Sequence, residues 1–246
     1  MYPDDAFAMW LNQNFIVARL DVTKEATLGK KYGVAWTPWL LVVDENGDTV
    51  AQTVGPLSAS DYQGWLDSAQ MGHAGFQDTL KMLSVTPDNA DMNMILGKAY
   101  FQAGNWAKAV EHLTVAMKGL GPDRAETCNE VCSLLGRAAV RKGDETAAKV
   151  ATDCLAKCKG SDAAVTLERT HVKLASGDAA GAQKEYEAFV KDHASDPCAP
   201  EAWYWLGVSS YLASHKPEGL MDAWQKLIAA APDNEWAKRA SMTVAK

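Results

Sequence analysis

The chain has 246 residues, of which 48% are apolar and 22% are charged, so it has room for one large domain or two modest ones, without a long disordered tail. A formal net charge of −7 and the lack of any lysine- or arginine-rich run argue against nucleic-acid binding. The longest apolar stretch, Trp39–Val43, is far too short to cross a bilayer, so we predict no membrane partner.

The start of the chain, MYPDDAFAMWLNQNF, does not have the pattern of a secretion signal. Asp4 and Asp5 make it acidic, and it lacks a basic segment followed by an apolar run. We therefore expect a cytoplasmic protein, or a periplasmic one if a signal peptide upstream of Met1 has been lost.

Residues 1 to about 57 carry the patterns of β-strands. The run Phe15–Val22 is short and mostly apolar, as in a buried strand. Two further runs, Leu40–Val43 and Thr49–Val54, flank Asn46-Gly47, a pair typical of tight hairpin turns that need a positive φ. We predict one strand followed by a β-hairpin.

After Ser58 the pattern becomes helical and repeats. Ser58 is an N-cap candidate for a helix that carries Trp65. Beyond it, Leu-Gly pairs recur, and turn glycines each precede an alanine by five residues. The pairs are Leu96-Gly97, Leu135-Gly136 and Leu206-Gly207, and each turn glycine with its alanine is Gly104 with Ala109, Gly143 with Ala148, and Gly177 with Ala182. Periods of 34 to 39 residues predict stacked helix hairpins.

These repeats resemble the tetratricopeptide family. The resemblance is carried by Leu96, Gly97, Tyr100, Gly104, Trp106, Ala109, Ala116 and Pro122, and again by Trp203, Leu206, Gly207, Trp224 and Pro232. It implies an all-α superhelix over residues 73–246, because one hairpin alone cannot bury its apolar face. Four repeats would span 90–122, 129–160, 163–196 and 200–233, followed by a closing helix from Asn234 to Ala245.

Residues 1–72 resemble thioredoxin from the third strand of its fold onward, which implies a partial α/β domain. The resemblance rests on Phe15–Val22, Lys31-Tyr32-Gly33-Val34, Thr37-Pro38, Asn46-Gly47, Gly55 and Trp65. It also implies a cis peptide bond before Pro38, with Trp36 and Thr37 lining a loop that touches bound peptide.

The reactive dithiol of thioredoxin is not found in this sequence, which has no Cys-x-x-Cys and no cysteine before Cys128. In that family the pair precedes the strand that corresponds to Phe15–Val22, at a helix N-terminus that lowers a thiol pKa. We therefore assign no catalytic residue and no cofactor. Our hypothesis is that the sequence is truncated at its N-terminus, with the pair upstream of Met1.

Four of the five cysteines form a pattern, Cys128-x3-Cys132 and Cys154-x3-Cys158. Each pair lies on one helix face, and the two pairs are symmetric about Gly143, so they face each other across a hairpin. Buried core thiols, two disulfides (Cys128 with Cys158, Cys132 with Cys154) and a four-thiolate metal site are all available; we assign no metal. The fifth, Cys198, is expected to be exposed.

The tetratricopeptide resemblance also implies a ligand groove lined by the first helix of each repeat. The matching positions are Met94, Lys98, Phe101, Arg137, Arg141, His171, Tyr204 and Tyr211. Basic and aromatic side chains along one groove suit an acidic or extended peptide. The alternative is an ordinary solvated face.

Three functions fit the sequence. The first is a protein-interaction scaffold that binds a protein or extended peptide through the repeats, with a thioredoxin-like domain lacking its dithiol. The second is a thiol–disulfide oxidoreductase whose Cys-x-x-Cys lies upstream of Met1. The third is a holdase that resembles the bacterial chaperedoxins, in which a thioredoxin domain is joined to tetratricopeptide repeats. As given, the chain is not expected to be an enzyme, and its oligomeric state is left open.

Overall fold

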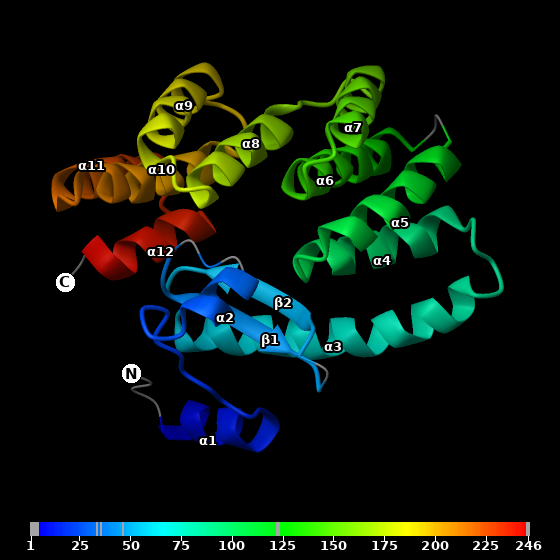
Figure 1. The fold of residues 1–246 in the computed structure, drawn as a ribbon, viewed down its shortest axis with the longest axis horizontal. Helices are drawn as coiled ribbons and strands as arrows, with labels where there is room; N and C mark the ends of the chain where they lie inside the picture. Colours follow the sequence, from blue (N-terminus) through cyan, green and yellow to red (C-terminus); the bar gives the residue numbers. More distant parts are fainter. Residues whose placement is uncertain (1–4, 33, 35, 46, 122–123, 245–246) are drawn as a thin grey trace.

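The computed structural model of the chain describes residues 5–32, 34, 36–45, 47–121 and 124–244. The first elements are α1 (Asp5–Asn14), α2 (Ala26–Lys31), β1 (Trp39–Val43), β2 (Thr49–Val54) and α3 (Ala59–Leu83). The others are α4 (Ala90–Gln102), α5 (Trp106–Gly119), α6 (Ala125–Lys142), α7 (Glu145–Lys157), α8 (Ala163–Ala175), α9 (Ala179–Asp192), α10 (Ala199–Ser214), α11 (Pro217–Ala230) and α12 (Glu235–Val244). The expected fold class, a partial α/β unit followed by all-α repeats, is confirmed (Figure 1).

β1 and β2 form the predicted antiparallel hairpin, in which Trp39 pairs with Val54. Gly47 has a φ of +77°, the left-handed conformation that this turn requires. Some residues used in the sequence predictions lie outside the described ranges, namely Met1, Asp4, Gly33, Asn46, Pro122 and Ala245.

The predicted strand Phe15–Val22 is wrong. The segment contains neither helix nor strand, and the side chains of Ile16 and Leu20 are exposed. A strand is stable only when a neighbouring strand satisfies its backbone hydrogen bonds. In the described part of the chain the sheet consists of β1 and β2, which pair with each other. The apolar run therefore has strand propensity but no strand to pair with.

Helix α3 joins the N-terminal part to the repeats without a linker. It begins at the predicted N-cap, where the Ser58 hydroxyl accepts a hydrogen bond from the Asp61 backbone N–H at 3.1 Å. The helix then continues for 25 residues, straight through residue 72, where the sequence suggested a domain boundary. One end of α3 packs Leu66 against Phe7 of α1, so a single helix contributes to the N-terminal core and leads into the first repeat.

The helices from α4 to α11 pack in consecutive pairs, as the repeat pattern predicts. A Cβ added to Gly97 would lie 2.6 Å from the Leu113 side chain, and one added to Gly207 would lie 2.8 Å from Trp224. The Leu-Gly motif therefore marks places where two helices approach too closely for any side chain. The turn glycines all have positive φ, and the alanines five residues later are fully buried, at Ala109, Ala148 and Ala182.

The β-hairpin lies inside the arc of helices and contacts both ends of it (Figure 1). At the C-terminal end, Arg239 of α12 donates a hydrogen bond to the Val54 carbonyl oxygen at 2.5 Å. Near the first repeat, the Gln52 side chain lies over Gly104 in the turn between α4 and α5. The hairpin thus occupies part of the concave face on which the repeat pattern predicts a ligand groove.

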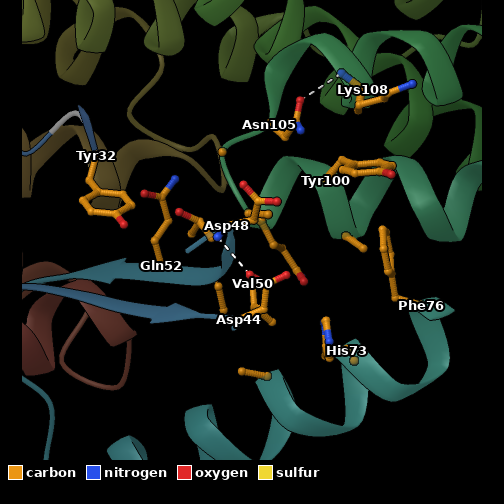
Figure 2. Close-up of a pocket in the computed structure, with 18 of the residues that line it drawn as sticks. Tyr32, Asp44, Asp48, Val50, Gln52, His73, Phe76, Tyr100, Asn105 and Lys108 are labelled. Atoms are coloured by element: carbon orange, nitrogen blue, oxygen red, sulfur yellow. Dashed lines mark hydrogen bonds between the residues drawn. The ribbon is translucent and has the colours of Figure 1, made fainter. Parts of the chain in front are cut away.

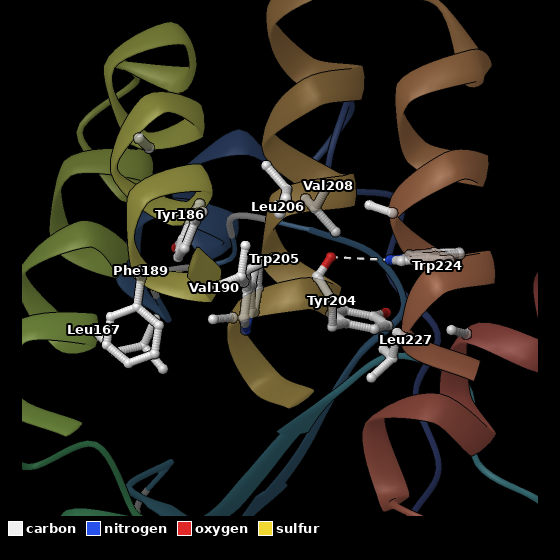
Figure 3. Packing of buried hydrophobic residues seen from close by; sticks show 14 of the residues in the cluster. Leu167, Tyr186, Phe189, Val190, Tyr204, Trp205, Leu206, Val208, Trp224 and Leu227 are labelled. Atoms are coloured by element: carbon white, nitrogen blue, oxygen red, sulfur yellow. Dashed lines mark hydrogen bonds between the residues drawn. The ribbon is translucent and has the colours of Figure 1, made fainter. Parts of the chain in front are cut away.

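The largest apolar cluster joins α8–α12 to the hairpin (Figure 3). Trp224 is 1% exposed, stacks on Tyr204 with ring centroids 4.9 Å apart, and donates its indole N–H to the Tyr204 carbonyl oxygen at 2.9 Å. Val54 of β2 belongs to the same cluster. The end of the repeat array and the N-terminal hairpin therefore share a core.

Candidate functional site

A cleft of about 1030 Å³ separates the β-hairpin from the first helix pair (Figure 2). Its hairpin side is formed by residues 49–53 of β2. The opposite sides carry aromatic side chains: Trp65 and Phe76 from α3, Tyr100 from α4 and Trp106 from α5. The volume is at the upper end of the range for ligand pockets in proteins, about 300–1000 Å³.

The wall formed by α3, α4 and α5 is held together by ring contacts, and the rings of Tyr100 and His112 are uncharged. Phe76 meets Tyr100 edge-on, with centroids 5.0 Å apart, and Tyr100 stacks on His112 at 5.3 Å. His112 Nδ1 lies 2.9 Å from Asn93 Oδ1. Burial raises the pKa of Tyr100 and lowers the pKa of His112, so both rings are neutral at pH 7.

Two of the lysines on the rim of the cleft are already paired. Lys108 lies 2.9 Å from Glu111, and Lys142 lies 3.0 Å from Asp144. The cleft therefore combines an aromatic wall, a strand and a largely compensated rim, which suits polypeptide backbone and apolar side chains better than a strongly charged ligand.

The proline loop lies at the C-terminal end of the repeats. The Thr37–Pro38 peptide bond is cis, as the resemblance implied. Trp36 packs edge-on against Tyr211 of α10, with centroids 6.0 Å apart, whereas the side chains of Thr37 and Pro38 are exposed. Tyr211, predicted to line the groove, thus contacts the chain's own N-terminal part.

The predicted groove residues on α4 and α6 do come together. Arg137 lies over the Phe101 ring at 5.1 Å, and Lys98 forms an ion pair with Glu130 at 2.5 Å. Met94 is partly buried against an apolar cluster of α5, α6 and α7 that includes Leu113, Val131 and Leu155. These side chains connect neighbouring repeats to each other.

Glu168 of α8 connects two of the predicted groove residues and was not predicted from the sequence. It is 2% exposed and forms ion pairs with both Arg137 and Arg141 of α6. Burial alone would raise the pKa of Glu168, but Arg141 and Arg137 outweigh it and lower the pKa to about 2. The one available signal was its position three residues before His171, on the same helix face.

Two predicted groove residues are buried, which corrects their assignment. Tyr204 is fully buried in the core, and burial raises its pKa to about 12. His171 is 6% exposed and lies between Tyr186 Oη at 2.5 Å and Glu201 Oε1 at 3.2 Å. Both side chains point toward neighbouring helices and away from the predicted groove. The spacing of the repeats does not predict how each helix is rotated about its own axis.

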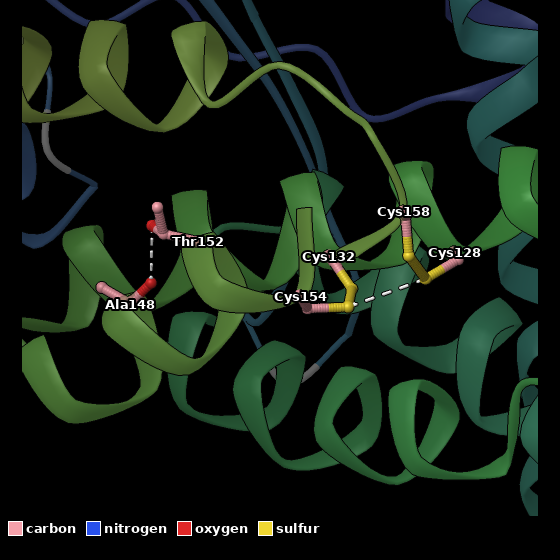
Figure 4. Close-up of a disulfide and its surroundings, with 6 residues drawn as sticks. All are labelled: Cys128, Cys132, Ala148, Thr152, Cys154 and Cys158. Carbon is pink, nitrogen blue, oxygen red and sulfur yellow. Dashed lines mark hydrogen bonds between the residues drawn. A yellow bond between two sulfur atoms is a disulfide. The ribbon is translucent and has the colours of Figure 1, made fainter. Parts of the chain in front are cut away.

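Of the three states open to the facing cysteines, the structure contains the two disulfides, Cys128–Cys158 and Cys132–Cys154 (Figure 4). They join α6 to the C-terminal end of α7. The remaining thiol, Cys198, is free and half-buried, where full exposure was expected. Burial, together with Asp196 and Glu201, raises the pKa of Cys198 to about 12, so it is a protonated and unreactive thiol at pH 7.

Reduction of the disulfides in the presence of a metal chelator is expected to lower the free energy of unfolding by about 3–5 kcal/mol, because the two nested bonds restrict the unfolded chain over loops of 30 and 22 residues. Urea unfolding with and without a phosphine reductant measures the difference. The Cys198→Ser variant is the control and should show the same loss. A chain equally stable in both conditions would contradict the expectation.

Comparison with known families agrees with this architecture. A thioredoxin-like domain matches residues 2–70, and the tetratricopeptide repeat matches residues 73–125 and 167–235. The cysteine hairpin falls between the two repeat matches. No curated protein matches the chain. Among the described residues, no helix is both long and apolar enough to cross a membrane. The chain is a thioredoxin-like domain followed by tetratricopeptide repeats, a class of repeat that mediates protein–protein interaction.

Proposed function

We propose that this chain is a protein-interaction scaffold that binds an extended segment of a partner protein in the cleft between β2 and the first helix pair. The observation that carries the proposal is the presence of a strand along one side of the cleft and an aromatic wall along the other. The proposal includes a boundary at residue 72 between the thioredoxin-like domain and the repeats. It also includes four repeats, at 90–122, 129–160, 163–196 and 200–233.

The edge of β2 supplies the backbone contacts. Residues 49–53, five in succession, all line the cleft. Because successive residues of a strand point to opposite faces of a sheet, a cleft lined by all of them reaches the edge of the strand. β1 pairs with β2 on its other side. An incoming segment can therefore add to β2 as a further strand, the binding mode known as β-augmentation.

The aromatic wall supplies the side-chain contacts. Every second side chain of a segment added to β2 would point toward Phe76, Tyr100 and Trp106, which favours apolar residues at those positions. Arg137 and Arg141 do not favour an acidic ligand, because Glu168 pairs with both of them and Glu201 lies 4.0 Å from Arg137, which gives two carboxylates for two guanidinium groups. The partner segment is therefore extended and largely uncharged.

A matched pair of glycine variants tests the site. Gly72 and Gly64 both lie on α3, and a Cβ at either would have no neighbour within 4 Å, but only Gly72 lines the cleft. Gly72→Trp should fill the cleft and weaken binding of a fluorescent peptide of alternating valine and threonine by about tenfold, or 1.4 kcal/mol. Gly64→Trp should bind like the unmodified chain.

Fluorescence anisotropy measures both affinities, and circular dichroism checks that both variants keep their helices. Equal affinities for Gly72→Trp and Gly64→Trp would contradict the proposed site. Suppression of aggregation of an unfolded protein, lost in Gly72→Trp, would extend the scaffold to the holdase function considered above.

A further inference from the structure

We propose that, once its two disulfides are reduced, the α6–α7 hairpin binds one zinc ion through the four thiolates of Cys128, Cys132, Cys154 and Cys158. This site is separate from the proposed peptide cleft and does not depend on it. The hairpin would then have two closed states, one held by disulfides and one by metal.

The positions of the sulfur atoms support a single four-coordinate site. The Sγ atoms of Cys128, Cys154 and Cys158 all lie within 4.8 Å of one another, and Cys128 Sγ is 3.6 Å from Cys154 Sγ, across the two disulfides. Cys132 joins this group through its bond to Cys154. In tetrahedral zinc sites the Zn–S distance is about 2.3 Å, which places the sulfur atoms about 3.8 Å apart.

The backbone already has the required spacing. The Cα atoms of the facing cysteines are 6.5 and 6.1 Å apart, and each helix presents its two thiols at i and i+4 on one face. Side-chain rotation alone can therefore turn four thiols toward one ion. Such a preformed set of ligands lowers the entropy that metal binding must otherwise overcome.

The hairpin does not rely on its sulfur bonds alone. Below the cysteines, the buried side chains of Leu135, Ala139, Ala148 and Ala151 pack α6 against α7. Cys132 is fully buried, whereas the other three cysteines are half-buried, which leaves a path for an ion to enter. The reduced thiols should therefore stay close together and accessible.

Positive charge near the cysteines suits a negatively charged metal site. Cys128 lies in the first turns of α6, near the positive end of the helix dipole. Lys157 and Lys159 flank Cys158 in the sequence and add positive charge near a site that carries a net charge of −2 when zinc binds four thiolates. Soft sulfur ligands in tetrahedral arrangement select zinc over calcium or magnesium.

The exchange between the two states balances. A dithiol reductant passes two electrons and two protons to each disulfide, which breaks the two S–S bonds and gives four thiols. Zinc then forms four Zn–S bonds and displaces four protons. In the reverse direction, two equivalents of an added small-molecule disulfide accept the four electrons and take up four protons to become thiols, while the four thiolates re-form two disulfides and release the zinc ion.

Metal titration of the reduced, metal-free chain tests the proposal. One equivalent of zinc should bind and protect the four hairpin thiols from a thiol reagent that modifies them in the reduced, metal-free chain, and cobalt in its place should give the intense absorption bands of a tetrahedral four-thiolate centre. The oxidised chain should bind neither metal. Cys198→Ser is the matched control and should bind one equivalent of zinc with the same affinity as the unmodified chain.

The variant with all four hairpin cysteines changed to serine should bind no zinc. Zinc binding by that variant equal to that of the unmodified chain would overturn the proposal. So would a reduced chain that binds no zinc, whether circular dichroism shows its helices intact or shows helix loss that zinc does not restore. A cobalt spectrum with fewer than four thiolates would exclude the four-cysteine site.

Discussion

Changing Glu168 to glutamine is expected to lower the free energy of unfolding by about 3 kcal/mol. The carboxylate is 2% exposed and forms ion pairs with Arg137 and Arg141. Glutamine keeps the size of the side chain but removes the ion-pair partner of Arg141 and the nearer of the two partners of Arg137, which keeps Glu201 at 4.0 Å. Removing one partner is the costly way to break a buried ion pair. Urea unfolding at pH 7 measures the loss.

The ion pairs of Glu168 with Arg137 and Arg141 also make the free energy of unfolding depend on pH under acidic conditions. Because the folded-state pKa of Glu168 is about 2, below its ordinary value of 4.5, its contribution to stability is fully present above pH 4.5. It is lost as the pH falls from 4.5 toward 2. Glu201, whose pKa is also lowered despite burial because His171 and Arg137 favour its charged form, acts in the same direction. The Glu168→Gln variant should therefore lose less stability than the unmodified chain over this interval.

Glu145→Gln is the matched control for Glu168→Gln. Glu145 also connects neighbouring repeats, through an ion pair with Arg169 at 2.8 Å, but both side chains are well exposed. Exposed pairs contribute little to stability, so this variant should unfold like the unmodified chain. Equal losses for the two variants would mean that burial of Glu168 does not matter.

Changing Trp224 to alanine is expected to lower the free energy of unfolding by about 4 kcal/mol. The ring is 1% exposed, stacks on Tyr204 and fills the space opposite Gly207. Its loss leaves a cavity in the cluster that joins the last repeat to β2. Since repeats contact mainly their neighbours, the loss should be greatest in α10–α12 and the hairpin. Hydrogen exchange resolved along the chain measures this distribution.

Trp203→Ala is the control for Trp224→Ala. Trp203 precedes Tyr204 on α10 but is only partly buried, and its ring faces Lys226 at 5.9 Å. A smaller loss of stability is expected, because less apolar surface returns to water. If the two variants unfold alike, or if Trp224→Ala affects α4–α7 as much as α10–α12, the account of a shared C-terminal core is wrong.

The position of the cleft beside the β-hairpin could not be predicted from the sequence. Trp65, Phe76 and Tyr100 are separated along the chain, and nothing in their spacing indicates that they face β2. The cleft exists because α3 runs on unbroken past residue 72 and brings the hairpin beside the first helix pair. The repeat pattern instead predicts a ligand groove that includes Arg137 and Arg141, and both arginines form ion pairs with Glu168.

The features that could be predicted from the amino-acid sequence are local and periodic. Gly104 and Gly143 mark helix turns because only glycine readily adopts positive φ there, and the symmetry of the cysteines about Gly143 predicts which thiols face each other, whereas the disulfides themselves come from the structure. The features that required the fold depend on residues distant in sequence. Phe15–Val22 is not a strand in the described chain because strand propensity needs a neighbour, and Tyr204 is core rather than groove because the rotation of a helix is set by what packs around it.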